Sequence, residues 1–478
     1  MDGDKMDAEN GNDMEVEQEE AEETASTQNE KQVYIPGVSR ALKDGEELTF
    51  DPEAYKLFYS FETRWSCLSF DTVRDNHGDR SDFPLECYVV AGTQADKPKN
   101  NEIVVMGLKN LHALEEEEDE DELSDEDSDS EDDEKKEAIM HSVTISHYGG
   151  INRVKVERLG DGTVCAVWND MGKVQLWNVT NALNECSKMT AAKNDEKQVQ
   201  VSFITKSITS YCLPIGDSVF SSFSRRSHSS HLAQRRKDMR WAGRKRSKEI
   251  SLPAIRAETY TSIECMKVAH GLLIRKLSMG ILASSFCFPS LRTVNICSPV
   301  GSVEDVHWSP TEEGLLASCS CDGTIKLWDT RSSPASACVC TVDKAHTSDV
   351  NVLSWNSQEA LLVSGGDDAE LKIWSLKTIQ FGQPVARFKY HSAPITSVEW
   401  LPQESTTFMA SGEDDQVTIW DIATEADSQD AVVGVPPQLM FLHLGQKEVK
   451  EVHWHPQIAG LAITTSLDGF NVFKTINI

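Results

Sequence analysis

Residues 350–374 read VNVLSWNSQEALLVSGGDDAELKIW, and this stretch begins and ends with a short strand pattern that closes on Trp. Val350–Trp355 and Leu371–Trp374 both mix apolar and polar residues with the period of two that half-buried strands require. The same pair of patterns recurs three more times, at Val303–Trp308 with Ile325–Trp328, Ile395–Trp400 with Val417–Trp420, and Val449–Trp454 with Phe470–Phe473.

The spacing of these copies indicates the fold class. The aromatic residues that end the second pattern lie 46, 46 and 53 residues apart along the chain. A period in the forties with several short strands per copy is typical of a β-propeller, whose blades are small antiparallel sheets. We therefore predict an all-β protein with a seven-bladed β-propeller, a fold that mostly serves as a rigid platform for binding other macromolecules.

Two further blades are expected nearer the N-terminus. Three strands of one blade are predicted at Leu68–Val73, Cys87–Gly92 and Ile103–Leu108, and three of the next at Ile151–Val156, Val164–Trp168 and Val174–Trp177. Trp177 and Trp328 are 151 residues apart, whereas two repeat steps would need roughly 92 residues. The seventh blade should fall in this interval.

The segment 198–297, inside that interval, does not follow the repeat. Residues 201–297 hold sixteen basic and five acidic residues, opposite to the balance of the rest of the chain. One interpretation is a shifted reading frame or a retained intron in the gene, in which case the chain need not encode the seventh blade. The other is a genuine basic insertion, in which Arg235–Lys237 and Arg244–Arg246 would form a nuclear localisation signal.

The negative charge is concentrated in two stretches. The chain carries a net charge of −31, of which residues 1–30 contribute −11 and residues 115–137 contribute −15. Both stretches have too few apolar residues to offset the entropy cost of ordering, so we expect a disordered acidic tail at 1–30 and a disordered acidic loop at 115–137. Such segments attract basic proteins and repel phosphates. We expect basic protein partners, no direct nucleic-acid binding and no membrane association.

Three serines in the second acidic stretch fit an acid-directed kinase such as casein kinase 2. Ser124, Ser128 and Ser130 each have an acidic residue three positions later. Phosphorylation would add further negative charge to the stretch and strengthen its attraction for basic proteins.

A helix is predicted over Asp51–Glu62, before the first blade. Asp51 suits the N-cap and Pro52 suits the first helical position. Tyr55, Phe58 and Phe61 would then form an apolar stripe along one face. We expect this stripe to pack on the side of the propeller.

No motif of an enzyme, a cofactor site or a metal site is recognised. The twelve cysteines form no C-x-x-C pair, and no uncharged apolar run reaches the length of a membrane span. His453 and His455 flank Trp454 as a metal pair would, but no third ligand is near in the sequence, so they are interpreted as surface or loop histidines. We expect a non-enzymatic protein of the reducing cytosol or nucleus, with no cofactor.

Two polar sets carry a family resemblance. The first comprises His346, Ser364, Asp368 and Trp374, and the second His391, Ser411, Asp414 and Trp420. They resemble the WD-repeat family, in which such side chains form a hydrogen-bonded chain that ties a loop to its blade. The resemblance implies a structural role for all eight residues and no catalytic one.

Within that family the chain resembles the histone-binding chaperones. The features shared are the predicted N-terminal helix, the entry Gly149–Val154 to the second blade, and an acidic insertion before Pro436 and Pro437. The resemblance implies a histone-binding helix segment at 31–66, a propeller at 67–478, and a side groove that takes a histone helix. The implied groove residues are Tyr55, Phe58, Phe61, Glu425, Asp427, Asp430, Pro436 and Pro437.

Val33–Gly37, Cys67–Asp71 and the acidic loop after Leu114 resemble the glutamate-rich members of this branch. Their relatives bind core histones and a large-subunit ribosomal protein in the nucleus and nucleolus. The resemblance implies the same partners and location for this chain. Both clients are strongly basic, in agreement with the acidic stretches.

An alternative function is suggested by Trp328, Asp329 and Arg331. This W-D-x-R ending resembles the box by which some propellers dock on the adaptor of cullin-4 ubiquitin ligases, which would make the chain a substrate receptor. A third possibility is a scaffold whose acidic loop only keeps it soluble.

Overall fold

A computed structural model describes residues 34–40, 49–114, 137–171, 174–189, 196–198, 303–333, 336–425 and 434–478. The chain divides into two units, Met1–Glu47 and Leu48–Ile478. In the first, residues 34–40 form a turn in which the Ser39 N–H donates to the Ile35 carbonyl at 2.8 Å. The strands lie in the second unit.

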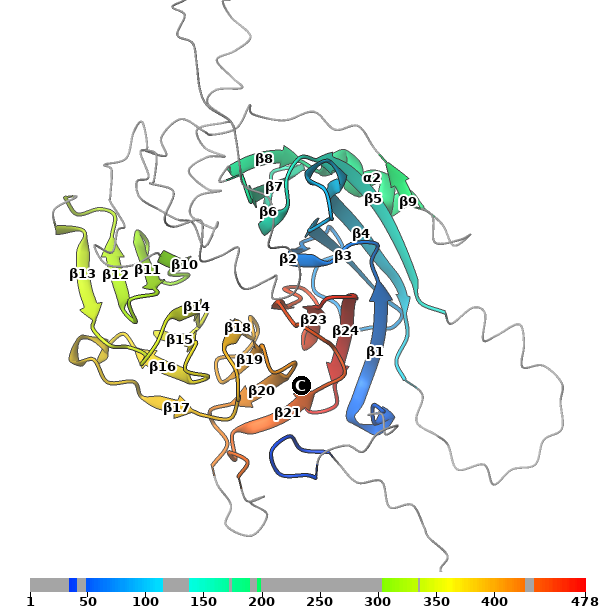
Figure 1. Ribbon diagram of the computed structural model, residues 1–478. Helices are drawn as coiled ribbons and strands as arrows, with labels where there is room; N and C mark the ends of the chain where they lie inside the picture. Colours follow the sequence, from blue (N-terminus) through cyan, green and yellow to red (C-terminus); the bar gives the residue numbers. More distant parts are fainter. Residues whose placement is uncertain are drawn as a thin grey trace, which may run out of the picture. The chain divides into compact units, whose positions relative to one another are not determined.

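Six sheets, numbered here as blades 1 to 6 in chain order, make up the second unit (Figure 1). Blade 1 consists of β2 (Cys67–Val73), β3 (Leu85–Thr93), β4 (Asn101–Leu111), β5 (Ile139–His147) and β9 (Glu196–Gln198). Blade 2 consists of β6 (Ile151–Leu159), β7 (Gly162–Asn169) and β8 (Val174–Asn178). Blade 3 consists of β10 (Val303–Trp308), β11 (Leu315–Ser320), β12 (Ile325–Asp329) and β13 (Cys338–Val342).

The last three blades have four strands each. Blade 4 consists of β14 (Val350–Trp355), β15 (Leu361–Gly366), β16 (Leu371–Ser375) and β17 (Ala386–Phe388). Blade 5 consists of β18 (Ile395–Trp400), β19 (Thr407–Gly412), β20 (Val417–Asp421) and β21 (Leu439–His443). Blade 6 consists of β22 (Glu451–Trp454), β23 (Leu461–Thr465), β24 (Gly469–Thr475) and β1 (Tyr55–Glu62).

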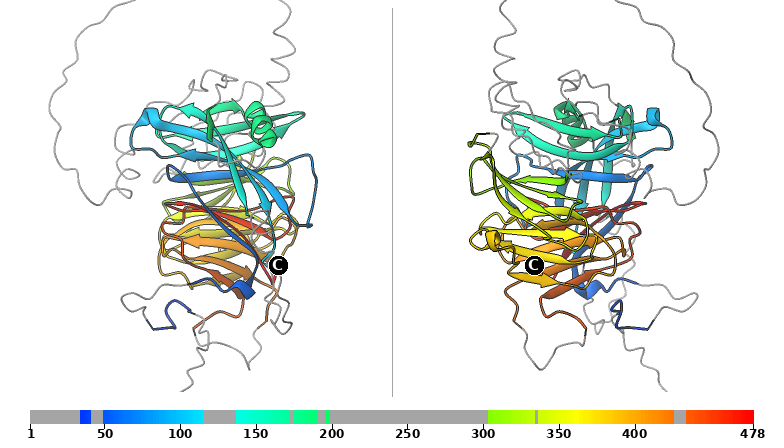
Figure 2. Two further views of the ribbon diagram at one scale, coloured as in Figure 1. Left: turned by 90° about the vertical axis from the view of Figure 1, so that its right-hand side faces the viewer. Right: turned by 60° about the vertical axis from the view of Figure 1, so that its left-hand side comes forward.

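Helices are few and short. The α-helix described is α2 (Thr180–Lys188), which packs on β4 and β5 of blade 1 (green helix in Figure 2). Short 3₁₀ turns occur at η1 (Pro52–Ala54), η2 (Pro98–Asn100) and η4 (Ile379–Phe381). No helix in the described ranges is long and apolar enough to cross a membrane.

The all-β propeller predicted from the repeat is therefore present, with six blades described. Every strand expected from the sequence overlaps an observed strand of its blade. The seventh blade was predicted within 198–297, and residues 199–297 lie outside the described residues. The acidic stretches 1–30 and 115–136 lie outside them as well.

Adjacent blades pack face to face around the inner strands, which contact one another in the order β10, β14, β18, β22, β2 and β6. Apolar clusters fill each interface, and Trp374 and Trp420 are almost fully buried in them. Burial of a large apolar side chain stabilises a fold by about 1.5–3 kcal/mol. Gly365 permits this close approach, because a Cβ there would lie 2.5 Å from Cγ2 of Ile395 in the next blade.

The N-terminal helix predicted over Asp51–Glu62 is wrong for most of its length. Asp51 does cap a helical turn, but η1 ends at Ala54 and the chain continues as the strand β1. β1 pairs antiparallel with β24 and completes blade 6. Leu57, Tyr59 and Phe61 alternate with polar Ser60 and Glu62 as a strand requires, and the free edge of β24 supplies the partner that selects the strand.

Candidate functional site

An aromatic cluster beside the start of β1 is the candidate functional site. Phe50 and Phe58 have ring centroids 4.9 Å apart, and Tyr55 lies 5.3 Å from Phe58 and 5.1 Å from Phe441 of β21. Phe50 is 47% exposed, whereas Tyr55 is only 7% exposed. This aromatic site (Phe50, Tyr55, Phe58 and Phe441) therefore has a buried base and an accessible rim.

A bulge in β1 decides which side chains reach the aromatic site. The pairing with β24 shifts between Tyr55 and Leu57, so that Lys56 is the extra residue. The shift places Tyr55 and Phe58 in one apolar cluster, while Phe61 packs in another with Phe70. A helical stripe would have put Phe61 beside Tyr55 and Phe58. In the structure Phe61 is instead part of the core between blades 6 and 1.

Tyr55 is held in place by a hydrogen bond with His443. The Tyr55 Oη and His443 Nδ1 atoms are 2.8 Å apart, and the Asn471 amide donates to His443 Nε2 at 3.0 Å. Burial raises the pKa of Tyr55 well above its ordinary value and lowers the pKa of His443 to about 3. Both groups are therefore neutral at pH 7, and the ring of Tyr55 is held rigidly before any partner arrives.

The predicted Pro-Pro segment leads directly into the aromatic site. Pro436 and Pro437 lie immediately before β21, the strand that carries Phe441. Pro437 and Glu425 are exposed and Pro436 is half-buried. The structure thus brings Tyr55, Phe58 and the Pro-Pro segment to neighbouring strands. The remaining groove residues predicted from the resemblance, Asp427 and Asp430, lie outside the described residues.

The acidic loop also starts beside the aromatic site. Leu114, the last described residue before it, packs in the same cluster as Phe58, and its N–H donates to the Lys56 carbonyl at 2.9 Å. At the other end, the Asn110 amide donates to the Glu137 carbonyl at 2.8 Å. The acidic stretch therefore begins beside the aromatic site, at Leu114, and the described chain resumes next to Asn110 on β4. The predicted phosphorylation sites Ser124, Ser128 and Ser130 lie outside the described residues.

The first predicted polar chain is present in blade 4. His346 Nδ1 lies 2.8 Å from Asp368 Oδ1, His346 Nε2 lies 2.7 Å from Ser364 Oγ, and the Trp374 indole donates to Ser364 Oγ at 2.9 Å. Burial raises the pKa of the Asp368 carboxylate, but the interaction with His346, the Thr347 N–H and the charge of Lys372 outweigh burial and hold the pKa well below its usual range. His346, Ser364 and Trp374 are buried, and Asp368 is half-buried, so this chain of hydrogen bonds joins β15 and β16 to the loops beside them.

The second chain differs from the prediction at one position. His391 contacts Asp414 at 3.0 Å, but its Nε2 and the Trp420 indole both meet Thr418 Oγ1, at 2.9 and 2.8 Å. Ser411 instead bonds to the Thr396 hydroxyl at 2.7 Å. A hydroxyl on the third strand can thus replace one on the second, because both point toward the same interface.

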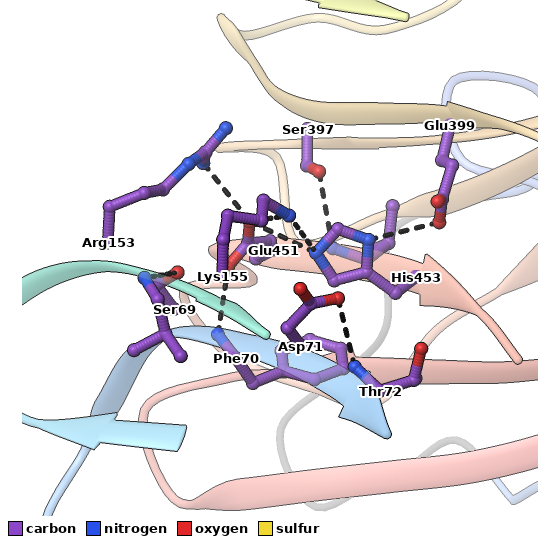
Figure 3. A network of polar contacts seen from close by, with 12 residues as sticks. Ser69, Phe70, Asp71, Thr72, Arg153, Lys155, Ser397, Glu399, Glu451 and His453 are labelled. Atoms are coloured by element: carbon purple, nitrogen blue, oxygen red, sulfur yellow. Dashed lines mark hydrogen bonds and ion pairs between the residues drawn. The ribbon is translucent and has the colours of Figure 1, made fainter. Parts of the chain in front are cut away.

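His453 and His455 are both buried, so the expectation of surface histidines is wrong, although His455 does lie in a loop that follows β22. His455 accepts the backbone N–H groups of Gln457 and Ile458 and is completely buried. His453 lies between Glu399 and Glu451, 3.0 and 3.1 Å away (Figure 3). Among the described residues no group of side chains has the arrangement of a metal site.

The W-D-x-R residues lie at the outer part of blade 3. The Trp328 indole donates to Ser318 Oγ at 2.9 Å and is buried. Arg331 is 65% exposed and forms a two-pronged contact with Asp329, at 2.9 and 3.0 Å. An exposed pair of this kind contributes little to stability, because solvent screens the two charges. Arg331 is therefore accessible and could exchange Asp329 for another partner at small cost.

Propeller blades closed by such polar chains, together with an accessible aromatic cluster where an N-terminal strand meets the fifth blade, define a WD-repeat protein. Two family models match parts of the chain. Residues 45–112 match the model for the histone-binding protein RBBP4 and its counterpart in the CAF1 complex. Residues 306–403 match the anaphase-promoting complex subunit 4 WD40 domain.

Relatives extend the similarity over nearly the whole chain. The ribosome assembly protein rrb1 of Schizosaccharomyces pombe is 32% identical over 95% of this chain and 87% of its own length. The glutamate-rich WD repeat-containing protein 1 of Dictyostelium discoideum is 34% identical, over 94% of this chain and 85% of its own. Protein HEAT STRESS TOLERANT DWD 1 of Arabidopsis thaliana is 34% identical over 93% and 92%. The chain belongs to the family of glutamate-rich WD-repeat proteins.

Proposed function

We propose that this protein is a nuclear and nucleolar chaperone that holds basic proteins, core histones and a large-subunit ribosomal protein among them, at the aromatic site. Family membership supports a chaperone or scaffold role in general, and the match of residues 45–112 to a histone-binding model supports histones as clients. The observation that carries the proposal is the position of Leu114. It joins the acidic stretch to the cluster that contains Phe58.

The chemistry of the site fits an amphipathic basic helix. Apolar side chains of such a helix would pack on the exposed rim formed by Phe50 and Phe58, where a rigid aromatic anchor contributes most to affinity. Its Lys and Arg side chains would face the acidic residues that follow Leu114 and those near Glu425. Apolar packing would set the stability of the complex, and charge would set its rate of formation and its salt dependence.

Two variants separate these contributions. Histone H4 binding is measured by titration at several salt concentrations, with the full-length protein. Phe58→Ala should weaken binding by about tenfold or more, because an aromatic side chain that becomes buried in the complex contributes about 1–2 kcal/mol or more. The salt dependence should stay unchanged. Deletion of 115–137 should mainly reduce the salt dependence.

Phe381→Ala is the matched control, since Phe381 is 70% exposed on blade 4 and belongs to a different surface. It should bind as the wild type does. Equal losses from Phe381→Ala and Phe58→Ala would refute the aromatic site as the binding surface. The same titration with a large-subunit ribosomal protein tests the second client.

A receptor role in a cullin-4 ligase is the second candidate, favoured by the exposure of Arg331 next to buried Trp328. An adaptor pull-down with Arg331→Ala tests it directly. Undiminished capture by the variant, or no capture by the wild type, removes this candidate. Neither result bears on the aromatic site, which lies on other blades.

A further inference from the structure

Neighbouring blades are linked by hydrogen bonds from a backbone N–H of one inner strand to a side chain of the preceding one. The Val154 N–H donates to Ser69 Oγ at 2.9 Å, and the Leu353 N–H donates to Asp305 Oδ2 at 3.1 Å. The accepting side chains are Ser69 and Asp71 on β2, Asp305 on β10, Ser354 on β14, Ser397 and Glu399 on β18, and Glu451 on β22.

The inner strand of blade 2 departs from this pattern. In its positions facing the centre β6 carries Arg153 and Lys155, and these side chains have hydrogen-bond donors but no acceptor. β6 therefore cannot receive the backbone N–H of a following strand through these two side chains. Both cations reach toward carboxylates of other blades instead (Figure 3).

Arg153 contacts two different blades. Its guanidinium lies 3.1 Å from Glu451 Oε1 on blade 6 and 3.6 Å from Asp305 Oδ1 on blade 3. Lys155 lies 3.8 Å from the same Glu451 oxygen. Asp305 and Glu451 side chains are only 2% and 1% exposed. Carboxylates buried to this degree need a paired charge. Besides Arg153, His307 Nε2 lies 3.2 Å from Asp305, and His453 Nε2 lies 3.1 Å from Glu451.

We infer that Arg153 is an ionic clasp that joins blade 2 to blade 3 and blade 6 through the centre of the propeller. The inner strand described next after β6 is β10, and Asp305 lies on it. The five other described pairs of successive inner strands have a side-chain-to-backbone hydrogen bond, whereas β6 and β10 are connected by the ion pair between Arg153 and Asp305. A planar guanidinium suits the role, because its separate N–H groups can serve two carboxylates at once, whereas an ammonium acts as a single point charge.

Hydrogen exchange by mass spectrometry on the full-length protein tests the clasp. Arg153→Met should raise exchange in β6–β8 and in β10 by about tenfold, since exchange reports local opening, and leave β18–β20 unchanged. Arg153→Lys should give a smaller rise. Lys155→Met is the matched control, because Lys155 contacts blade 6 but makes no ion pair with Asp305, and it should leave β10 as in the wild type.

Asp305→Asn provides a second route if Arg153→Met does not fold. The amide keeps an oxygen for the Leu353 N–H but loses the charge that pairs with Arg153. It should raise exchange in β6–β8, on the opposite side of the ion pair. Unchanged exchange in β6–β8 and β10, or a uniform rise across every blade, would overturn the clasp.

Discussion

Blade 4 and blade 6 are both four-stranded antiparallel sheets, yet they are closed by different means. In blade 4, His346, Ser364 and Trp374 are linked by hydrogen bonds within one continuous stretch of chain. In blade 6, Gln446 takes the place of the histidine and bonds to Thr464, and Phe473 takes the place of the tryptophan. The fourth strand of blade 6, β1, comes from the other end of the chain.

The difference teaches where a repeat protein can place a binding site. Phe473 has no N–H to satisfy, and its ring stacks on His443 with the centroids 4.2 Å apart. His443 is then available to fix Tyr55, which β1 brings in from outside the repeat. In a complete repeat such as blade 4, the polar side chains bond to one another and hold the blade together. In blade 6 the repeat is completed by β1, which comes from outside the repeat. The aromatic site lies where β1 meets β21 of blade 5.

Removing the central hydroxyl of each blade should give the largest difference between blade 4 and blade 6 in the free energy of unfolding. Ser364→Ala leaves both His346 Nε2 and the Trp374 indole without their partner. At about 1–3 kcal/mol for each unsatisfied group, the free energy of unfolding should fall by about 2–6 kcal/mol. Thr464→Ala deprives only Gln446 of its partner and should cost about half as much. Urea unfolding measures both, and equal losses would contradict the contrast drawn between the blades.

The sequence predicts the complete blades better than the incomplete one, for a physical reason. Periodicity and the His, Asp and Trp positions of blade 4 are local, so one stretch of chain contains all the partners. In blade 6 the corresponding bond runs from the hydroxyl of Thr464 to Gln446. No local pattern shows that His443, which ends the preceding blade, is bonded to Tyr55 near the N-terminus.

The aromatic site could be predicted only in part. Tyr55 and Phe58 share a face both on a helix and on a strand with a bulge, so the two elements bring the same pair together. Phe61 separates the two alternatives, and it lies in the core with Phe70. Phe441 was not predicted as a site residue. Its position on β21 next to the Pro-Pro segment is the signal that could have identified it.

The inner strands of the two blades predict a difference in pH dependence. Blade 6 carries Glu451 and His453 where blade 4 carries Val352 and Ser354. Burial and Lys155 lower the pKa of His453, but the adjacent carboxylates outweigh them and raise it to about 9. A raised folded-state pKa adds stability that is complete below the unfolded value near 6.5 and is lost as the pH rises through 9.

Stability should therefore fall by about 2 kcal/mol between pH 7 and 9 through His453 alone. Urea unfolding at both pH values compares the wild type with His453→Gln, in which this loss should be absent. The buried cysteine thiols, whose pKa burial also raises, add a loss at higher pH that is common to both proteins. An identical decline in the variant would show that His453 is not the titrating group.

The smallest expected effect concerns the contact between Tyr55 on β1 and His443 on β21. Tyr55→Phe removes the contact to His443 and keeps the ring, so the free energy of unfolding should fall by about 1 kcal/mol. Neutral His443 then retains only the Asn471 bond, and the aromatic rim of Phe50 and Phe58 stays in place. Histone affinity should change less than twofold, in contrast to Phe58→Ala. A tenfold loss of affinity in Tyr55→Phe would mean that the phenol, and not the apolar rim, recognises the partner.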